Sequence, residues 1–138
     1  GVGGNLGRLL GAVHRWPWCP LGTKRNARST VNVHTLAAFV AHLVEKRAPG
    51  AYCIQDPEPI STIGILKLMA ASMPKHAVIT EMPAPLRGIV KLLRPEFARS
   101  LLSSFVVSDE TSRATSFDSF FEREAGFAEM VSHYLEHR

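Results

Sequence analysis

The stretch ARSTVNVHTLAAFVAHLVEKRAPGAYCI, residues 27–54, decides the fold class of this chain. Residues 29–33 alternate and are rich in β-branched side chains, which is typical of a short strand. A helical apolar pattern then runs from Thr35, a suitable N-cap, to Lys46, and a Pro-Gly pair stops it. The continuous apolar run at 51–54 is typical of a buried parallel strand. Strand, helix and strand in this order predict a mixed α/β fold.

The segments on either side continue this alternation of helices and short strands. Two prolines keep residues 16–21 extended, because proline removes a backbone donor and restricts its neighbour. The patterns predict further helices at 5–15 with Asn5 as N-cap, at 61–73 capped by Ser61 or Thr62, at 85–93, at 95–102 and at 120–137, and further strands at 77–80 and 105–107. The length of 138 residues suits a single domain.

Composition excludes several classes of protein. No apolar run approaches the roughly 20 residues that span a bilayer, and no basic-then-apolar leader pattern is present. Cys19 and Cys53 stand among apolar neighbours, at a spacing unsuited to zinc, and two cysteines are too few for a disulfide scaffold. We therefore expect a cytoplasmic protein with no membrane partner, in which both thiols are reduced and at least partly buried.

The net charge of +4 conceals an asymmetry along the chain. Residues 1–50 carry seven Lys/Arg against one acid, whereas residues 105–138 carry three against seven. A basic first third indicates an anionic partner such as a phosphate group. Neutralisation by the acidic C-terminal helix within the fold is the alternative, and the charge pattern alone leaves both open.

Glycines open the chain in the pattern GVGGNLG, residues 1–7, which satisfies GxxGxxG. A dinucleotide loop of this kind directly follows a strand and has an acidic residue about 20 positions later. The sequence shows no strand before Gly1, and the first acid is Glu45, so a cofactor-binding loop is not predicted. The glycines and Asn5 instead suit a helix start, whose backbone N–H groups attract an anion.

Chemistry-bearing side chains form no recognisable catalytic or metal-binding set. His133 and His137 are one helical turn apart but lack a third ligand, so a surface pair is expected. Neither Tyr52 nor Tyr134 is followed four positions later by lysine. Arg28 lies at the entry to the first strand, where it can fork two donors onto a phosphate; a solvated loop cation is the alternative. We predict no catalytic residue and no metal site.

Four stretches follow a known pattern in order. GVGGNL at 1–6 resembles the tail of YGPGVxxN(F/L), PLG at 20–22 with NARSTVNV at 26–33 resembles PLGxxxNRRSLVYV, YCIQDPEPIST at 52–62 resembles FxVSDGEPxST, and PAPLR at 83–87 resembles the start of PVPPxLLR. Over residues 1–104 the chain therefore resembles the C-terminal part of an extended short-chain dehydrogenase/reductase, the family of NAD-dependent sugar-nucleotide epimerases and dehydratases. The nearest branch is the UDP-glucose 4-epimerase-like members of polysaccharide biosynthesis.

The resemblance implies a fold and a substrate site. The fold would be α/β, the C-terminal substrate-binding portion of a Rossmann-type enzyme with mixed helices and short strands. The implied substrate-binding residues are Asn5, Leu6, Trp18, Cys19, Pro20 and Arg28. Asn5 would contact the nucleotide-sugar, Arg28 would bind its diphosphate, and residues 18–20 would run beside the uracil. The basic first third would then face a dianionic diphosphate.

In this family the cofactor loop and the catalytic Tyr-xxx-Lys pair belong to an N-terminal half that this sequence lacks. We therefore expect residues 1–138 to be a single domain or a fragment, inactive alone, with NAD bound only in the intact enzyme. Expected partners are the UDP-sugar, the N-terminal half and, as an open possibility, a second copy. Nucleic acid is not expected, because Trp16 and Trp18 are not interleaved with basic residues. Apolar surface on the helix at 36–46 and the strand at 51–54 would leave a fragment marginal or self-associating.

A non-catalytic binding or regulatory module derived from this family is the alternative. Thr35 stands where the family's helix cap has Asp, Asn32 stands where it has His or Tyr, and the terminal LGWxP pattern is absent. These departures favour the module slightly. Coding sequence upstream of Gly1 would distinguish the enzyme fragment from the non-catalytic module, because a Tyr-xxx-Lys pair encoded there would support the enzyme.

Overall fold

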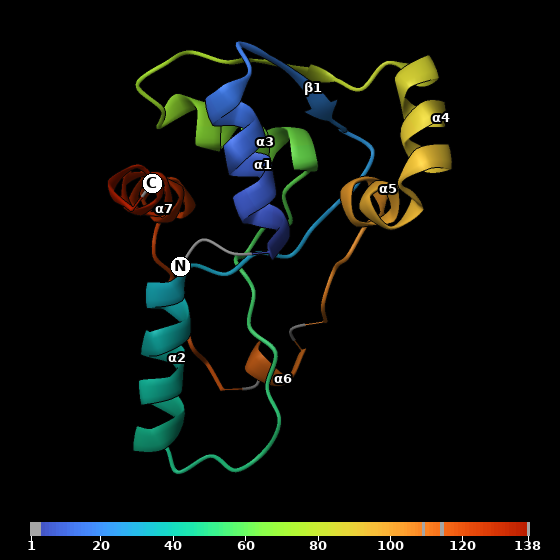
Figure 1. Cartoon of the computed structure of the whole chain (residues 1–138). Coiled ribbons are helices and arrows are strands. Elements are labelled where there is room, and N and C mark those ends of the chain that lie inside the picture. The colour runs from blue at the N-terminus through green and yellow to red at the C-terminus, as the bar shows by residue number, and fades with distance from the viewer. Residues whose placement is uncertain (1–3, 109, 114, 138) are drawn as a thin grey trace.

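The computed structural model describes residues 4–108, 110–113 and 115–137. Its elements are α1 (Gly4–Arg15), β1 (Trp18–Gly22), α2 (Val33–Glu45), α3 (Thr62–Ala71), β2 (Val78–Glu81), α4 (Ala84–Leu93), α5 (Pro95–Leu102), α6 (Glu110–Arg113) and α7 (Arg123–Glu136). The fold is mixed α/β, as predicted, and its described strands form one two-stranded parallel sheet (Figure 1). No helix within these ranges is long and apolar enough to cross a membrane.

β1 and β2 are joined by a long connection, as parallel strands require, and this connection contains α2 and α3. In the sheet Trp18 lies opposite Val78, and the register shifts before the strands end. A Cβ atom on Gly22 would lie 2.7 Å from the side chain of Ile63 and 2.9 Å from the carbonyl oxygen of Thr80. Only glycine therefore lets the end of β1 approach α3 this closely.

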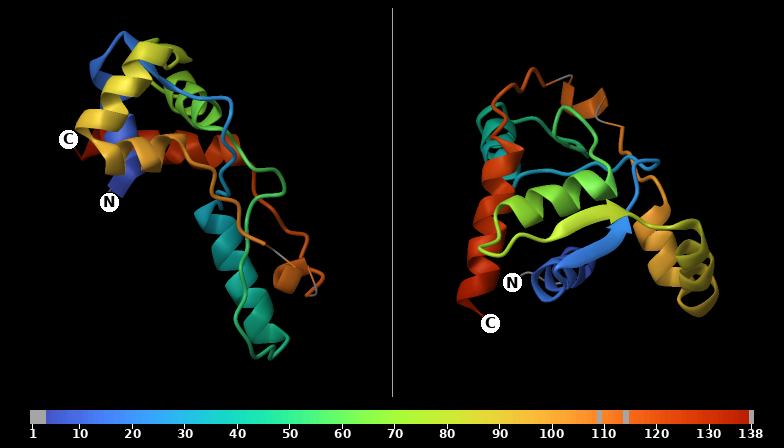
Figure 2. Two further views of the ribbon diagram at one scale, coloured as in Figure 1. Left: turned by 90° about the vertical axis from the view of Figure 1, so that its right-hand side faces the viewer. Right: turned by 90° about the horizontal axis from the view of Figure 1, so that it is seen from above.

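The hydrophobic core lies between α1, α3, α5, α7 and the sheet, and Figure 2 shows these elements gathered into one body. α3 is central to this body, because it contacts α1, α7 and both strands. The largest fully buried apolar side chains that join these elements are Leu10, Cys19, Leu66, Met69, Met82 and Val131.

α2 extends away from the body, with loops and α6 beside it (Figures 1 and 2). Only Thr35 and Phe39 of α2 are buried. The ring of Phe39 packs edge-on against those of Tyr52 and Phe117, with centroids 6.0 and 5.2 Å apart. A separate aromatic cluster, rather than the main core, therefore holds α2 to the rest of the chain.

Three predicted strands are wrong. Residues 29–33, 51–54 and 105–107 form no strand, and only isolated bridges join Arg28 to Ile60 and to Phe105. A strand needs a partner that continues beside it, and Thr30 and Asn32 instead bond to the side chain and backbone of Asp56. The apolar composition of these segments is compatible with a strand but does not supply that partner.

Two predicted helix caps are also wrong, whereas the third is confirmed. The N-cap of α2 is Asn32, whose side chain accepts from the N–H of His34 at 2.9 Å. Thr35 lies buried one turn later, and its hydroxyl accepts from the N–H of Phe121 at 3.0 Å. α1 begins at Gly4, so Asn5 lies inside the helix rather than at its cap. Ser61 caps α3, as predicted.

The two cysteines differ in exposure. Cys19 on β1 is buried, as predicted, and belongs to the core. Cys53 is exposed, so the prediction that it is at least partly buried is wrong. Burial of Cys53 depended on the strand predicted at 51–54, which has no sheet to join in the described chain.

Candidate functional site

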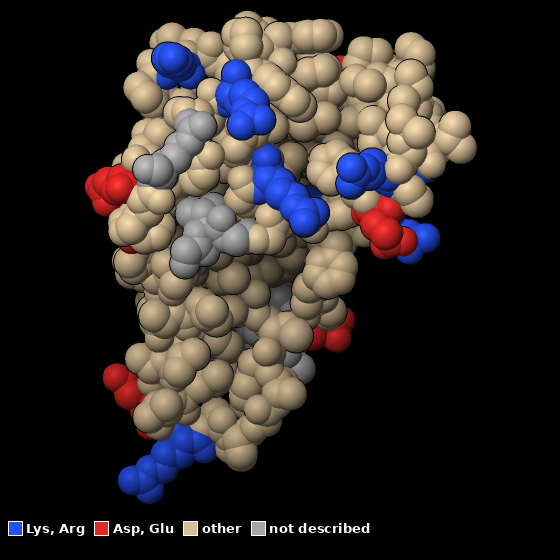
Figure 3. Space-filling model, viewed as in Figure 1, with Lys and Arg blue, Asp and Glu red and all other residues tan. Residues whose placement is uncertain are grey.

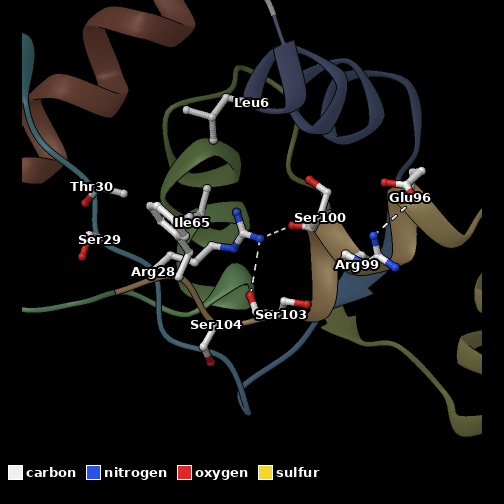
Figure 4. Close-up of a pocket in the computed structure, with 11 residues that line it drawn as sticks. Leu6, Arg28, Ser29, Thr30, Ile65, Glu96, Arg99, Ser100, Ser103 and Ser104 are labelled. Carbon is white, nitrogen blue, oxygen red and sulfur yellow. Dashed lines mark hydrogen bonds and ion pairs between the residues drawn. The ribbon is translucent and has the colours of Figure 1, made fainter. Parts of the chain in front are cut away.

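Three of the predicted substrate-binding residues meet at one place on the body. Leu6 of α1 and Arg28 both line a cavity of about 420 Å³ (Figure 4). Asn5 lines an adjoining hollow of about 50 Å³ together with the same two residues. Five of the nine other lining residues carry a hydroxyl group: Ser29, Thr30, Ser100, Ser103 and Ser104. The fold thus brings residues 5, 6 and 28 together at adjoining cavities.

The backbone around Arg28 is clamped between two other segments. Arg28 and Ile60 exchange two backbone hydrogen bonds, both of 2.9 Å. On the other side, the N–H of Ser29 donates to the carbonyl of Phe105, and the N–H of Phe105 donates to the carbonyl of Ala27, both at 2.8 Å. The position from which the arginine side chain enters the cavity is therefore fixed from both sides.

The guanidinium of Arg28 points toward the C-terminal end of α5 (Figure 4). Its Nη2 donates to the carbonyl oxygen of Ser100 and, at 3.5 Å, to that of Ser103. Carbonyl groups at a helix C-terminus carry partial negative charge, so they attract a cation. The Nε of Arg28 is buried and has no hydrogen-bond partner within the described residues, and burial lowers the pKa of this side chain.

Asn5 is joined to the same end of α5. Its amide Nδ2 donates to the hydroxyl of Ser100, the residue whose carbonyl accepts from Arg28. The first turn of α1 and the residue 28 segment therefore meet at one serine, although 72 residues separate Arg28 from Ser100. A ligand between Asn5 and Arg28 would be in contact with α5 as well.

A second arginine stands at the rim of the cavity, with an acid beside it. Arg99 and Glu96 form an ion pair of 3.4 Å in which both side chains are well exposed. An exposed pair of this kind is held only weakly, so Arg99 can exchange Glu96 for another anion at little cost. Hydroxyls and two guanidinium groups suit this cavity to an anionic ligand.

A second cavity, of about 390 Å³, adjoins the first and shares Leu6, Ser29 and Thr30 with it. Its polar wall is an ion pair of 3.3 Å between Arg123 and Asp56, two side chains that are largely buried. Asp56 also accepts from the hydroxyl of Thr30 at 2.7 Å and from a backbone N–H. Every contact of this carboxylate is thus internal, so its role is to hold the loop at residue 56 against α7.

The other three predicted residues lie elsewhere. Trp18, Cys19 and Pro20 are on β1 and are not among the residues that line these two cavities. Cys19 is fully buried in the core, and the indole N–H of Trp18 donates to the hydroxyl of Thr80 on β2 at 3.0 Å.

Sequence reasoning missed the contribution of α5 and of the loop at residue 56. The residues it did not single out are Asp56, Ser100, Ser103, Ser104 and Arg123. The close spacing of serines at 100, 103 and 104 was the available signal, but serine is common in loops and helix ends. Their importance follows from the contact with Arg28, which the sequence does not show.

Among the described residues, neither cavity is lined by a histidine or a cysteine. Along the described ranges no set of three or more His, Cys, Asp or Glu side chains is placed to hold a metal. The rings of His133 and His137 lie 4.2 Å apart and are exposed, as predicted for a surface pair. The arrangement can grip and orient an anion.

Basic side chains surround this region of the surface. Figure 3 shows Lys and Arg over α1 and near α5 on the face drawn in Figure 1. α1 contributes Arg8 and Arg15 and contains no acid. None of the ion pairs found between described residues joins an arginine of α1 to α7.

No protein-family model matches this chain, and no curated protein or solved structure matches it either.

Proposed function

We propose that the cavity at Arg28 binds the diphosphate of a nucleotide-sugar. The chain would be the substrate-binding portion of an NAD-dependent sugar-nucleotide epimerase or dehydratase, similar to a UDP-glucose 4-epimerase. The observation that carries this proposal is the guanidinium of Arg28, half-buried at a cavity wall, whose Nε has no partner among the described residues. Asn5 and Leu6, which the resemblance also assigns to the substrate, border the same space.

A diphosphate is a stronger partner for Arg28 than its present one. The guanidinium now donates to two neutral carbonyl oxygens at the end of α5. Hydrogen bonds to an ionised oxygen are roughly twice as strong as those between neutral groups, and guanidinium can make two in parallel. Turning from α5 to a phosphate is therefore favourable, and the carbonyl of Ser103, an exposed residue, can bond to water instead.

The two adjoining cavities suit a ligand of two parts. Their volumes of about 420 and 390 Å³ each lie within the range of small-molecule sites, roughly 300–1,000 Å³. A diphosphate beside Arg28 could extend past Leu6 and Thr30, which both cavities share, into the second one. The serine hydroxyls would donate to phosphate oxygens, while the apolar side chains of the second cavity would pack against the attached group.

The described residues do not fit NAD. A dinucleotide site needs a glycine-rich turn from a strand directly into a helix. Here β1 is followed by the loop at 23–32, and β2 enters α4 through Met82 and Pro83. NAD is therefore a proposed cofactor of an intact enzyme, and the role proposed for this chain is to hold and orient the substrate.

A non-catalytic binding or regulatory module of the same family is the second candidate. The observation that favours it is Thr35, which is fully buried and bonded to the N–H of Phe121 where the family pattern has Asp. Both candidates share the site at Arg28. A Tyr-xxx-Lys pair in the coding sequence upstream of Gly1 would favour the enzyme.

Titration calorimetry of the 138-residue chain with a UDP-sugar tests the proposal. We expect saturable binding that weakens about tenfold in Arg28→Ala, which corresponds to roughly 1.4 kcal/mol. Arg28→Lys should not restore it, because an ammonium group cannot reproduce the planar fork. Arg25→Ala, at an exposed position three residues earlier, is the matched control and should change affinity less than twofold.

Circular dichroism of each variant must first show a native fold, because Arg28 also holds the end of α5. Equal affinity of wild type and folded Arg28→Lys would remove Arg28 from the site, and lack of binding by wild type would overturn the proposal. Competition by inorganic pyrophosphate would assign the affinity to the diphosphate. Titration with NAD should show no saturable binding.

A further inference from the structure

The outward face of α4 is apolar, although the inner face of this helix already packs against the body. Leu86 and Val90 on the inner face contact the hydrophobic core. Ile89, Leu92 and Leu93 are 53%, 83% and 69% exposed, and no residue of α4 is buried. Leu92 is the most exposed large apolar side chain among the described residues. The core therefore accounts for only one side of α4.

The exposed apolar side chains of α4 protrude from the molecule. Figures 1 and 2 show α4 at the periphery of the body, next to α5. Residues 84–94 line none of the cavities described above. A protruding apolar edge of this kind can enter the headgroup layer of a membrane, which needs no groove on the protein.

The charges within and next to α4 are all positive. Residues 82–95 contain no Asp or Glu. Lys91 and Arg94 are exposed, and neither forms an ion pair or a side-chain hydrogen bond with another described residue. Arg87 adds a third positive charge on the side of the helix toward the body. Two cations are therefore available to an anionic partner beside the apolar face.

The acids that flank this segment do not cancel its charge. Glu96 is paired with Arg99 at 3.4 Å, and Glu81 accepts from the backbone N–H of Lys24 at 3.2 Å. Residues 81–99 contain four Lys or Arg and these two glutamates, so their net charge is +2. In the view of Figure 3, no charged side chain covers α4, and Lys and Arg lie next to it near α5. An apolar face with a basic border is complementary to anionic lipid.

We propose that α4 lies on an anionic lipid surface, with Ile89, Leu92 and Leu93 in the headgroup layer and Lys91 and Arg94 at the lipid phosphates. Long cationic side chains at the edge of an apolar face reach phosphates while their stems stay on apolar surface. An amphipathic helix of this kind lies in the plane of the membrane.

This proposal revises the expectation that the chain has no membrane partner. That expectation followed from the lack of an apolar run that could span a bilayer, and a helix that lies on the surface needs no such run. The proposal does not depend on the cavity at Arg28. Each basic residue near an anionic surface strengthens partitioning by about fivefold, so both lipid charge and apolar insertion are needed for binding.

Co-sedimentation of the 138-residue chain with vesicles tests the proposal. We expect wild type to bind vesicles of equimolar phosphatidylcholine and phosphatidylglycerol, and to bind pure phosphatidylcholine at least about tenfold more weakly, because that surface carries no net charge. Raising the salt concentration from about 0.1 to 1 M should weaken binding to the anionic vesicles, since it shortens the screening length from about 10 to 3 Å.

Paired substitutions locate the apolar contact. Leu92→Gln with Leu93→Gln should weaken binding to anionic vesicles at least about tenfold, because it removes the side chains that enter the headgroup layer. Val33→Gln with Val44→Gln is the matched control, since these side chains are 64% and 70% exposed but lie on α2. The control should bind as wild type.

A second pair of variants tests the bases. Lys91→Gln with Arg94→Gln should weaken binding to anionic vesicles at least about tenfold and leave binding to pure phosphatidylcholine unchanged. Lys67→Gln with Lys75→Gln lowers the net charge equally at exposed positions outside α4 and should change binding less than about twofold.

Three outcomes would overturn the proposal. Wild type that binds no anionic vesicles would leave the face to a protein partner, and equal binding to both kinds of vesicle would reject the recognition of charge. Binding that survives in the Leu92, Leu93 variant, or that is lost equally in the α2 control, would place the contact elsewhere. Circular dichroism should match wild type for all variants, whose substituted positions are exposed.

Discussion

α2 and α3 are both largely apolar helices, yet α3 is mostly buried and α2 is mostly exposed. α3 buries six of its 10 residues at the centre of the body, whereas α2 buries two of its 13. Composition does not separate these helices. What separates them is the number of elements packed around each, because α3 is enclosed by α1, α7 and the sheet, whereas an aromatic cluster and single hydrogen bonds, such as that between His34 and Glu129 of α7, hold α2. Apolar content indicates that a helix needs covering, and the tertiary contacts decide whether it is covered within one chain.

The largest effect that this comparison predicts is on the free energy of unfolding. Leu66→Ala removes a fully buried side chain of α3 and should destabilise the chain by about 3 kcal/mol, since it leaves a cavity. Val40→Ala on α2, where the side chain is 52% exposed, should change stability by less than about 0.5 kcal/mol. Urea unfolding at low protein concentration measures both, and equal losses would contradict the contrast.

A smaller effect is expected where a polar residue joins two elements of the body. The amide of Asn26, which is buried, donates to the hydroxyl of Thr62 at 2.7 Å and to the carbonyl of Leu101 at 3.1 Å. Its oxygen accepts from the N–H of Thr62 at 3.0 Å. Asn26→Ala leaves these buried groups unsatisfied and should cost about 2 kcal/mol.

Asn5→Ala is the control for this experiment, because it removes a hydrogen bond between exposed groups. Its cost in urea unfolding should stay below about 1 kcal/mol. A loss in Asn26→Ala no greater than that in Asn5→Ala would show that the link between α3 and α5 contributes little to the body.

The elements that the sequence predicts correctly are those specified by local residues. α3 begins after Ser61 because a hydroxyl caps the helix, and α5 begins at Pro95 because proline suits a first turn. The strand predicted at 51–54 fails because a strand depends on a distant partner. In the candidate site, Asn5 and Arg28 follow from the resemblance, but the carbonyls of Ser100 and Ser103 depend on where α5 ends in space.

Amide hydrogen exchange should separate α2 from α3 by a moderate factor. Few buried contacts hold α2, so we expect it to open locally, whereas α3 should exchange only when the body unfolds. At a few micromolar, amides of α2 should exchange at least about tenfold faster than those of α3, a difference of roughly 1.4 kcal/mol. Equal protection of both helices would show that one cooperative unit includes α2.

The smallest expected effect concerns the two cysteines, which differ in burial. Cys19 belongs to the body, and Cys53 is exposed in the loop after α2. Burial raises the pKa of the Cys19 thiol, and a backbone hydrogen bond at Leu21 offsets part of that rise. The unfolded chain therefore ionises this thiol first as pH rises, so the stability that it contributes is complete below the ordinary thiol pKa, about 8.5, and is lost above it.

As pH rises past the ordinary thiol pKa, about 8.5, the free energy of unfolding should fall in wild type and in Cys53→Ser, by at most about 1.4 kcal/mol per pH unit for one proton. Cys19→Ala should lose this slope, although its stability is lower at every pH because a buried side chain is shortened. In native protein a thiol reagent should modify Cys53 at once and Cys19 only as the body unfolds. Equal labelling rates would show that the two thiols are equally accessible. A pH slope that disappears in Cys53→Ser rather than in Cys19→Ala would show that Cys53, not Cys19, is the thiol whose ionisation is linked to folding.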